Sequence, residues 1–460
     1  MIFLKRYKRI FIVTLSFLLF TGQFAPINAF GSFFSAKPEP KGFFGKIFSN
    51  QKAAKNRSFV KPIIWSSVIA VGLLIVGSLI YGNSKSKDNS GESAEQGQAR
   101  LGNGAKKGGN IVGNENLPDG LTRNEFEPPV NLKKGSEAIV DQWTENKAPI
   151  VYDAGYNIGF FGLEKLHPFD SKKYGKAFQS LRDFGIQEGQ FLKPGMVTDE
   201  DLRTVHSQEY LDSLKSSRNV ARIAEIPIAR FSPNFILQNN LLDPMRKATA
   251  GTALAARLAV EHNRNFVNLG GGYHHAKEGS GGGFCFFADI PYAVKRLWET
   301  NPNLRVMVID LDAHQGNGHE AIFKDDERVS IFDVYGEDTY PYNRDGTRQY
   351  ITYNYPVRRA IGDREYLGVI ERNLPRAFEQ SQPDLIIYNA GTDPLDGDRV
   401  GGMHITRQGL INRDELVFRF AGEHNVPVCM VTSGGYTQAS AGIISDSLKN
   451  LMNKNYLHKP

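Results

Sequence analysis

The sequence predicts one large α/β domain with a mostly parallel central sheet, preceded by a long N-terminal segment of different character. Three observations lead to this prediction. From about residue 148 onward, short apolar runs rich in Val and Ile alternate with longer amphipathic stretches, as in sheets covered by helices on both faces. A chain of 460 residues with 41% hydrophobic content can bury a full core. Finally, polar clusters follow the ends of the apolar runs, where ligands gather in such sheets.

Residues 1–29 are expected to be a signal peptide or a short membrane anchor, because basic residues precede an uncharged apolar run at 10–20. Residues 30–62 are expected to form a basic loop. Residues 1–61 carry 11 Lys and Arg against a single acid, Glu39. Since the whole chain carries +6 and this stretch +10, the remainder is near −4. This distribution favours membrane lipid as a partner and gives no reason to expect nucleic acid; a solvated basic linker is the simpler alternative.

Residues 63–81 are predicted to form a transmembrane helix. The run has 19 residues without a charge, and at about 1.5 Å per residue it matches a hydrocarbon core of about 30 Å. Trp65 and Tyr81 stand where interfacial aromatic residues belong; a buried core helix is the alternative. The positive-inside rule leaves the orientation open, but if residues 10–20 also insert, the main domain lies in the cytoplasm. We therefore expect a membrane-anchored protein whose main domain lies in the cytoplasm.

Residues 82–147 are predicted to be a flexible linker, because they are rich in Gly, Ser, Asn, Lys and Glu and show little apolar periodicity. The globular domain is expected over residues 148–455. The chain has two cysteines, Cys285 and Cys429, so neither a disulfide framework nor a Cys-based zinc site can form. Apolar runs predict strands, and amphipathic stretches predict helices: strands at 266–269, 305–312, 329–334, 384–390 and 426–432, and helices at 290–300 and 365–381.

A metal site is predicted at the ends of two of these strands. Asp310, Asp312 and His314 alternate as one strand runs out, and side chains two apart in a strand project to the same face. Asp393 follows another strand. One His and two carboxylates with open positions form a typical ligand set of catalytic zinc. Fe²⁺, which would use two His and one carboxylate, stays open. Each Asp taken alone would more often form a turn or cap a helix.

Two further groups suggest acid–base chemistry. The tandem His274 and His275 lie in a Gly-rich loop after a strand, where adjacent imidazoles can serve as base and then acid. Tyr436 follows a strand and two glycines, well placed for its hydroxyl to meet an oxyanion. Taken singly, an incidental His pair and a packing Tyr are the commoner interpretations. Their combination with the metal cluster favours catalysis.

The motifs GGYHHA, GGGFC, DLDAHQGNGHE, YNAGTDPL and TSGGY occur in the order typical of histone deacetylases, and the sequence resembles that family over about residues 149–451. The Gln315 and Asn317 pair resembles class IV, as do the stretches GLEKLHPFD, PNFILQNNLL and NRDELVFR. The resemblance implies the arginase/deacetylase fold, a single domain with about eight strands in its parallel sheet. It also implies roles for single residues: Asp312, His314 and Asp393 as zinc ligands, His274 and His275 as catalytic histidines, and Tyr436 as oxyanion donor.

Further roles follow from the resemblance alone. Asp310 would orient His274 and would also belong to a structural potassium site with Asp333. Asn317 stands where most classes place a second Asp beside His275. That departure removes a negative charge, so His275 should keep a lower pKa and act more readily as a neutral base.

The resemblance also implies a substrate channel and an activity. Gly283, Phe284 and Tyr340 resemble the walls of a narrow acyl-lysine channel; ordinary core aromatics are the alternative for the two rings. The implied function is zinc-dependent hydrolysis of N6-acyl-lysine, acetyl or longer, in an acylated protein. An acetylpolyamine or small-amide amidohydrolase on the same site is the nearest alternative.

Two other functions fit the sequence less well. A catalytically silent acyl-lysine-binding membrane scaffold would be expected to lack a zinc ligand or the Tyr, and none is missing. An arginase-like site with two manganese ions would need further carboxylates, which DAHQGN does not supply.

Overall fold

The computed structural model describes residues 141–159 and 169–460. The predicted signal peptide or anchor at 1–29, the basic loop at 30–62, the transmembrane helix at 63–81 and nearly all of the linker at 82–147 lie outside these residues. Among the residues that are described, no helix is both long enough and apolar enough to cross a membrane.

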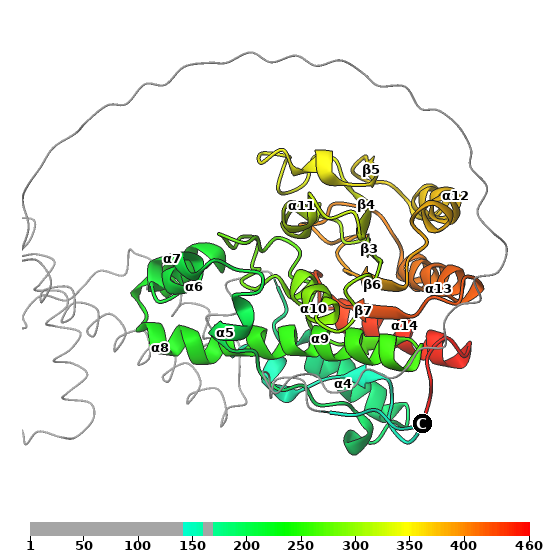
Figure 1. The fold of residues 1–460 in the computed structure, drawn as a ribbon, viewed down its shortest axis with the longest axis horizontal. Coiled ribbons are helices and arrows are strands. Elements are labelled where there is room, and N and C mark those ends of the chain that lie inside the picture. The colour runs from blue at the N-terminus through cyan, green and yellow to red at the C-terminus, as the bar shows by residue number, and fades with distance from the viewer. Residues whose placement is uncertain (1–140, 160–168) are drawn as a thin grey trace, which may run out of the picture. The chain divides into compact units, whose positions relative to one another are not determined.

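The domain is built around a seven-stranded sheet in which all neighbouring strands run parallel (Figure 1). The five inner strands are the five predicted, because strands buried on both faces are continuous apolar runs. In spatial order the strands are β1 (Ile150–Val151), β2 (Phe266–Asn268), β7 (Val428–Val431), β6 (Leu385–Asn389), β3 (Val306–Asp310), β4 (Val329–Gly336) and β5 (Tyr353–Val357).

The two edge strands, β1 and β5, were not predicted from the sequence. β1 has only two residues, and β5 alternates between half-buried and exposed positions and contains Pro356, which suits an edge strand. Neither is a continuous apolar run. With them, the described part of the chain has seven strands, one fewer than the number implied by the family resemblance.

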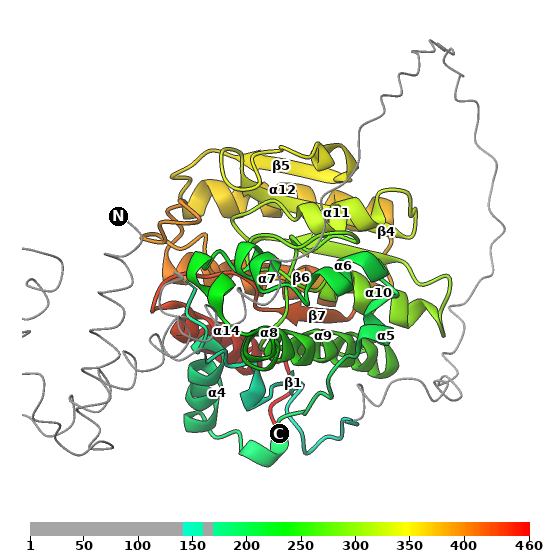
Figure 2. The same ribbon diagram turned by 90° about the vertical axis from the view of Figure 1, so that its left-hand side faces the viewer.

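Helices cover both faces of the sheet. Figure 1 shows α10 and α11 on one side of the strands and α12, α13 and α14 on the other. In Figure 2 the long helix α9 lies alongside β7, against which it packs. The predicted helices at 290–300 and 365–381 are confirmed as α10 and α12. The α-helices are α4 (Lys173–Asp183), α5 (Asp199–Leu202), α6 (Gln208–Ser213), α7 (Ser217–Ile223), α8 (Asn234–Leu237), α9 (Asp243–His262), α10 (Asp289–Trp298), α11 (Asn317–Phe323), α12 (Asp363–Ser381), α13 (Arg407–Glu423) and α14 (Ser440–Asn453). Short helical turns are η2 (Ala154–Tyr156), η4 (Glu188–Gln190), η5 (Pro227–Phe231), η6 (Gln238–Leu242) and η7 (Thr347–Tyr350).

Three inner strands carry buried polar residues in register with one another. Asp310 at the end of β3 pairs with Asp333 of β4 on one side and with Asn389 of β6 on the other. All three side chains are fully buried. Because parallel strands end at the same edge of a sheet, the segments that follow β3, β6 and β7 bring their residues into one region.

Candidate active site

Asp312, His314 and Asp393 converge at this edge, as the sequence predicted. All three are buried, and their ligand atoms lie within 4.8 Å of one another. Nδ1 of His314 lies 3.0 Å from Asp312 Oδ1 and 2.9 Å from Asp393 Oδ2. A Cβ at Gly434 would lie 2.5 Å from Asp312 Oδ2 and 2.6 Å from Asp393 Oδ2, so the absence of a side chain there lets the backbone approach both carboxylates.

The chemistry of these donors fits a zinc ion. Asp393 Oδ1 accepts a hydrogen bond from the Ala313 amide at 2.8 Å, whereas the buried Asp393 Oδ2, although 2.9 Å from His314 Nδ1, makes no hydrogen bond. Nδ1 of His314 carries at most a single proton, yet it faces two carboxylate oxygens. One imidazole and two carboxylates directed at a common point form a set that could hold zinc with positions left open for water and substrate.

The tandem histidines differ in their surroundings. Nδ1 of His274 lies 2.8 Å from Asp310 Oδ2, and its Nε2 lies 3.7 Å from Asp312 Oδ1. Nδ1 of His275 lies 2.8 Å from the Oδ1 atom of Asn317, and the two rings are 4.1 Å apart. Each histidine therefore has its own orienting partner, a carboxylate for His274 and an amide for His275.

These partners separate the two pKa values. Burial disfavours the charged ring of His274, but the carboxylates of Asp310 and Asp312 outweigh burial and raise its pKa to about 9. Burial, with the positive charge of His274 next to it, holds the pKa of His275 well below its ordinary value. One ring of the pair is thus suited to carry a proton and the other to accept one, a division typical of acid–base sites.

Tyr436 and the predicted channel residues surround this cluster. The Tyr436 ring packs edge-on against His314 at 6.1 Å, and its amide donates to Asp398 Oδ2 at 2.8 Å. The Tyr340 ring meets His275 edge-on at 4.7 Å. The cavity at the site is lined by Phe169, Tyr174, Gly271, Gly272, Tyr273, His274, His275, Gly283, Phe284, Cys285, Asp312, Ser433, Gly434 and Tyr436. Gly283 and Phe284 are thus in its wall, whereas Tyr340 does not line it and contacts His275 instead.

Two residues of the site were missed from the sequence. The Phe169 ring lies 5.2 Å from Phe284 and 6.2 Å from Tyr436. Lys173 is fully buried and donates to the backbone carbonyls of Ser433 and Gly434, the latter at 2.7 Å. Burial lowers the pKa of Lys173 to about 8. The sequence offers no signal for it, because exposed lysines stand at 172 and 176.

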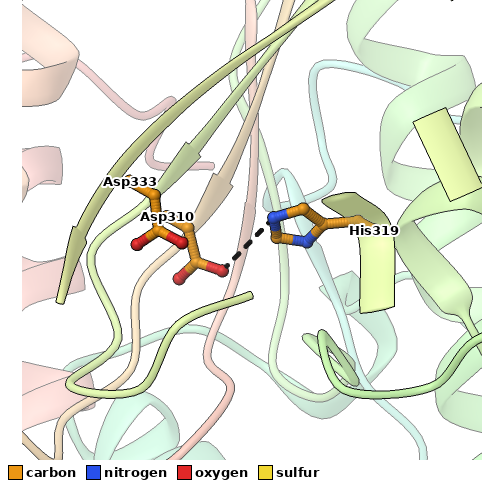
Figure 3. A group of neighbouring side chains, drawn as sticks. All are labelled: Asp310, His319 and Asp333. Carbon is orange, nitrogen blue, oxygen red and sulfur yellow. Dashed lines mark ion pairs between the residues drawn. The ribbon is translucent and has the colours of Figure 1, made fainter. Parts of the chain in front are cut away.

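The structure also contains a second buried group of potential ligands (Figure 3). It comprises Asp310, His319 and Asp333, whose ligand atoms also lie within 4.8 Å of one another. Asp333 Oδ2 accepts from the Gly316 amide at 3.0 Å, but Asp333 Oδ1 and both ring nitrogens of His319 have no hydrogen-bond partner. Burial and the neighbouring acids Asp310 and Glu320 hold the pKa of Asp333 well above its usual range. The structure thus brings together the two predicted potassium residues and adds His319, which was not predicted.

Comparison with known proteins extends this picture. The family model for the histone deacetylase domain matches residues 167–452. Histone deacetylase 2 of Arabidopsis thaliana is 47% identical over 307 residues, which cover 66% of this chain and 79% of the relative. An uncharacterized protein of Picosynechococcus is 31% identical over 291 residues, covering 63% of this chain and 92% of the relative. Human histone deacetylase 1 is 30% identical over 313 residues, covering 64% of this chain and 62% of the relative.

Proposed function

Since the chain belongs to the histone deacetylase family and is therefore a hydrolase of the deacetylase type, we propose that it uses zinc to hydrolyse the amide of N6-acyl-lysine in proteins. The observation that carries this proposal is the convergence of the Asp312, His314 and Asp393 cluster with two differently tuned histidines in one cavity. The presence of Tyr436 beside the cluster supports an active enzyme rather than a silent acyl-lysine-binding scaffold.

The zinc ion would be held by Asp312, His314 and Asp393. When bound there, zinc polarises the acyl carbonyl and acidifies a water molecule, which together supply several kcal/mol of transition-state stabilisation. The buried Asp393 Oδ2 without a hydrogen-bond partner supports this assignment, because a ligated cation satisfies it.

Side chains of the protein accept a proton from the attacking water and donate one to the leaving amine. Asn317 engages Nδ1 of His275, so Nε2 is free to take a proton from the attacking water. As the water oxygen bonds to the acyl carbon and the C–N bond breaks, His274, which holds a proton because Asp310 favours its charge, donates that proton to the lysine amine. After the products leave, His275 loses the proton that it took from water and His274 regains one. The Tyr436 hydroxyl donates to the oxyanion that develops on the carbonyl oxygen. The products are a carboxylic acid and the protein with its lysine side chain free.

The test is hydrolysis of matched lysine peptides carrying acetyl, octanoyl or myristoyl groups by the full chain purified with zinc. We expect release of the acyl group, loss of this release on chelation and recovery when zinc is added back. The ranking of the peptides identifies the preferred acyl length; the long chains are included because the predicted membrane segment at 63–81 would place the site near lipid. Retention of zinc without release of any acyl group would contradict the proposal, and acetylated polyamines would then be assayed.

We further propose that Asp310 and Asp333 belong to a structural potassium site. The buried Asp333 Oδ1 without a hydrogen-bond partner supports a cation there. Replacing choline chloride with potassium chloride at constant ionic strength should raise the Tm by a few degrees. The reason is that a cation at a hundredfold excess over its Kd stabilises the folded state by about 2.7 kcal/mol. Asp333→Asn should remove the potassium dependence of Tm, whatever its basal stability. An equal response of parent and variant would exclude Asp333 as a ligand.

A further inference from the structure

We propose that Asp345 is a positioning residue that fixes the amide of Asn317 and, through it, the tautomer of His275. This inference deepens the proposed function, because it rests on His275 being the base. Asp345 lies on the connection between β4 and β5, outside every motif of the family resemblance. It reaches the site through two hydrogen bonds in series, from Asp345 to Asn317 and from Asn317 to His275.

The contacts form a continuous chain from the surface to the catalytic ring. Asp345 Oδ2 accepts from Asn317 Nδ2 at 2.6 Å, and Asn317 Oδ1 lies 2.8 Å from His275 Nδ1. Lys277 pairs with the same carboxylate oxygen from the other side. The side chain of Asp345 is 26% exposed, whereas Asn317 and His275 are buried. Only the outer end of the chain therefore touches solvent.

Asp345 decides which way the Asn317 amide points. A carboxylate only accepts hydrogen bonds, so it must face the NH₂ end of the amide. The carbonyl end then faces His275 and can only accept, which places the imidazole proton on Nδ1 and leaves the lone pair on Nε2. Burial alone would raise the pKa of Asp345, but hydrogen bonds from Lys277 and Asn317 outweigh it and lower the pKa, so the carboxylate stays ionised.

Asp345 is itself held in place by its neighbours. Its Oδ1 accepts from the Thr347 hydroxyl at 3.1 Å, and that hydroxyl accepts from Gln315 Nε2 at 3.0 Å. Arg348 donates to Gln315 Oε1 at 3.2 Å. The segment from 345 to 348 thus contacts both amides of the Gln315 and Asn317 pair. A carboxylate that orients a histidine directly needs no such outer partner, because both of its oxygens accept hydrogen bonds. An amide has one accepting and one donating end, so a further residue must fix which end faces the histidine.

Asp345→Asn tests the inference, because an amide at 345 can face either end of Asn317. We expect kcat on the best acyl-lysine peptide to fall about tenfold to a hundredfold, the usual loss when a residue that orients a metal ligand is replaced. KM and zinc content should change little. Asp338→Asn is the matched control: Asp338 is exposed on the same connection, and its replacement should leave kcat at the parent value. A kcat for Asp345→Asn within twofold of the parent would overturn the inference.

A double variant separates positioning from a general effect on the loop. Asn317→Asp combined with Asp345→Asn exchanges the amide and the carboxylate, so a carboxylate faces His275 directly and the outer amide donates to it. We expect this pair to recover most of the kcat lost in Asp345→Asn, whereas Asn317→Asp alone places two carboxylates side by side and should be impaired. A double variant no better than Asp345→Asn would mean that Asp345 only supports the loop.

The tautomer can also be observed without turnover. Nitrogen-15 NMR of labelled full-length protein distinguishes protonated from unprotonated ring nitrogens, and the His275 signals are identified by their loss in His275→Gln. We expect the proton on Nδ1 in the parent and a mixed or reversed pattern in Asp345→Asn. The NMR and hydrolysis experiments therefore test different claims. A parent that hydrolyses no peptide contradicts the proposed function, whereas an unchanged His275 pattern in Asp345→Asn contradicts the inference about Asp345.

Discussion

Replacing Asp393 with asparagine is expected to remove zinc and to reduce acyl-lysine hydrolysis at least about a thousandfold, because several kcal/mol of transition-state stabilisation depend on the metal and each 1.4 kcal/mol is about a factor of ten. The fold should survive, since an amide of nearly the same size can still accept from the Ala313 backbone. The atom that is lost is the buried Oδ2 facing His314, which an NH₂ group cannot replace as a ligand.

The measurements for Asp393→Asn are zinc content, peptide hydrolysis and Tm with and without added zinc. The parent should be stabilised by zinc, by about 4 kcal/mol at a thousandfold excess over Kd, and the variant should not. Asp396→Asn is the matched control, because Asp396 follows in the same segment and its side chain is 64% exposed. A variant at 393 that kept both its zinc and its hydrolytic rate would exclude Asp393 from the ligand set.

Tyr436→Phe is expected to lower kcat about a hundredfold to a thousandfold, the usual cost of losing one donor to an oxyanion. KM and zinc content should change little, because the ring stays in place against Phe169 and His314 and only the hydroxyl is removed. Stability should be near that of the parent for the same reason. The expected signature is therefore a folded, zinc-loaded and nearly inactive protein.

The comparison for Tyr436→Phe is Tyr342→Phe, which removes a hydroxyl from a ring that is 55% exposed on the β4–β5 connection. That control should keep the parent kcat and KM. Retention of more than about a third of the parent kcat in Tyr436→Phe would show that the oxyanion is stabilised by other groups, because a factor of three corresponds to only about 0.65 kcal/mol.

The sequence indicated the inner sheet and the central cluster for the same physical reason. Parallel strands buried on both faces are continuous apolar runs, so their ends can be located, and residues just beyond those ends meet at one edge. The alternation of Asp310, Asp312 and His314 suggested one strand face, but β3 ends at Asp310, so Asp312 and His314 lie in the segment that follows it and Asp310 belongs to the second ligand group. The edge strands could not be predicted in this way, because β1 is too short and β5 too exposed to form a continuous apolar run.

By itself, the sequence determined the family, through its motifs and its similarity to known deacetylases. It also determined the inner strands and the residue types gathered at their ends, because these depend on local spacing. Only the tertiary structure decided which side chains arriving from distant segments complete the site. Lys173 donates to the carbonyls of Ser433 and Gly434, 260 and 261 positions away in the sequence, and Asp345 accepts from the Asn317 amide, 28 positions away. No periodicity in the sequence predicts either contact. The opposite pKa shifts of His274 and His275 have the same origin. The two rings are adjacent in sequence, but burial and the choice of a carboxylate or an amide partner exist only once the chain has folded.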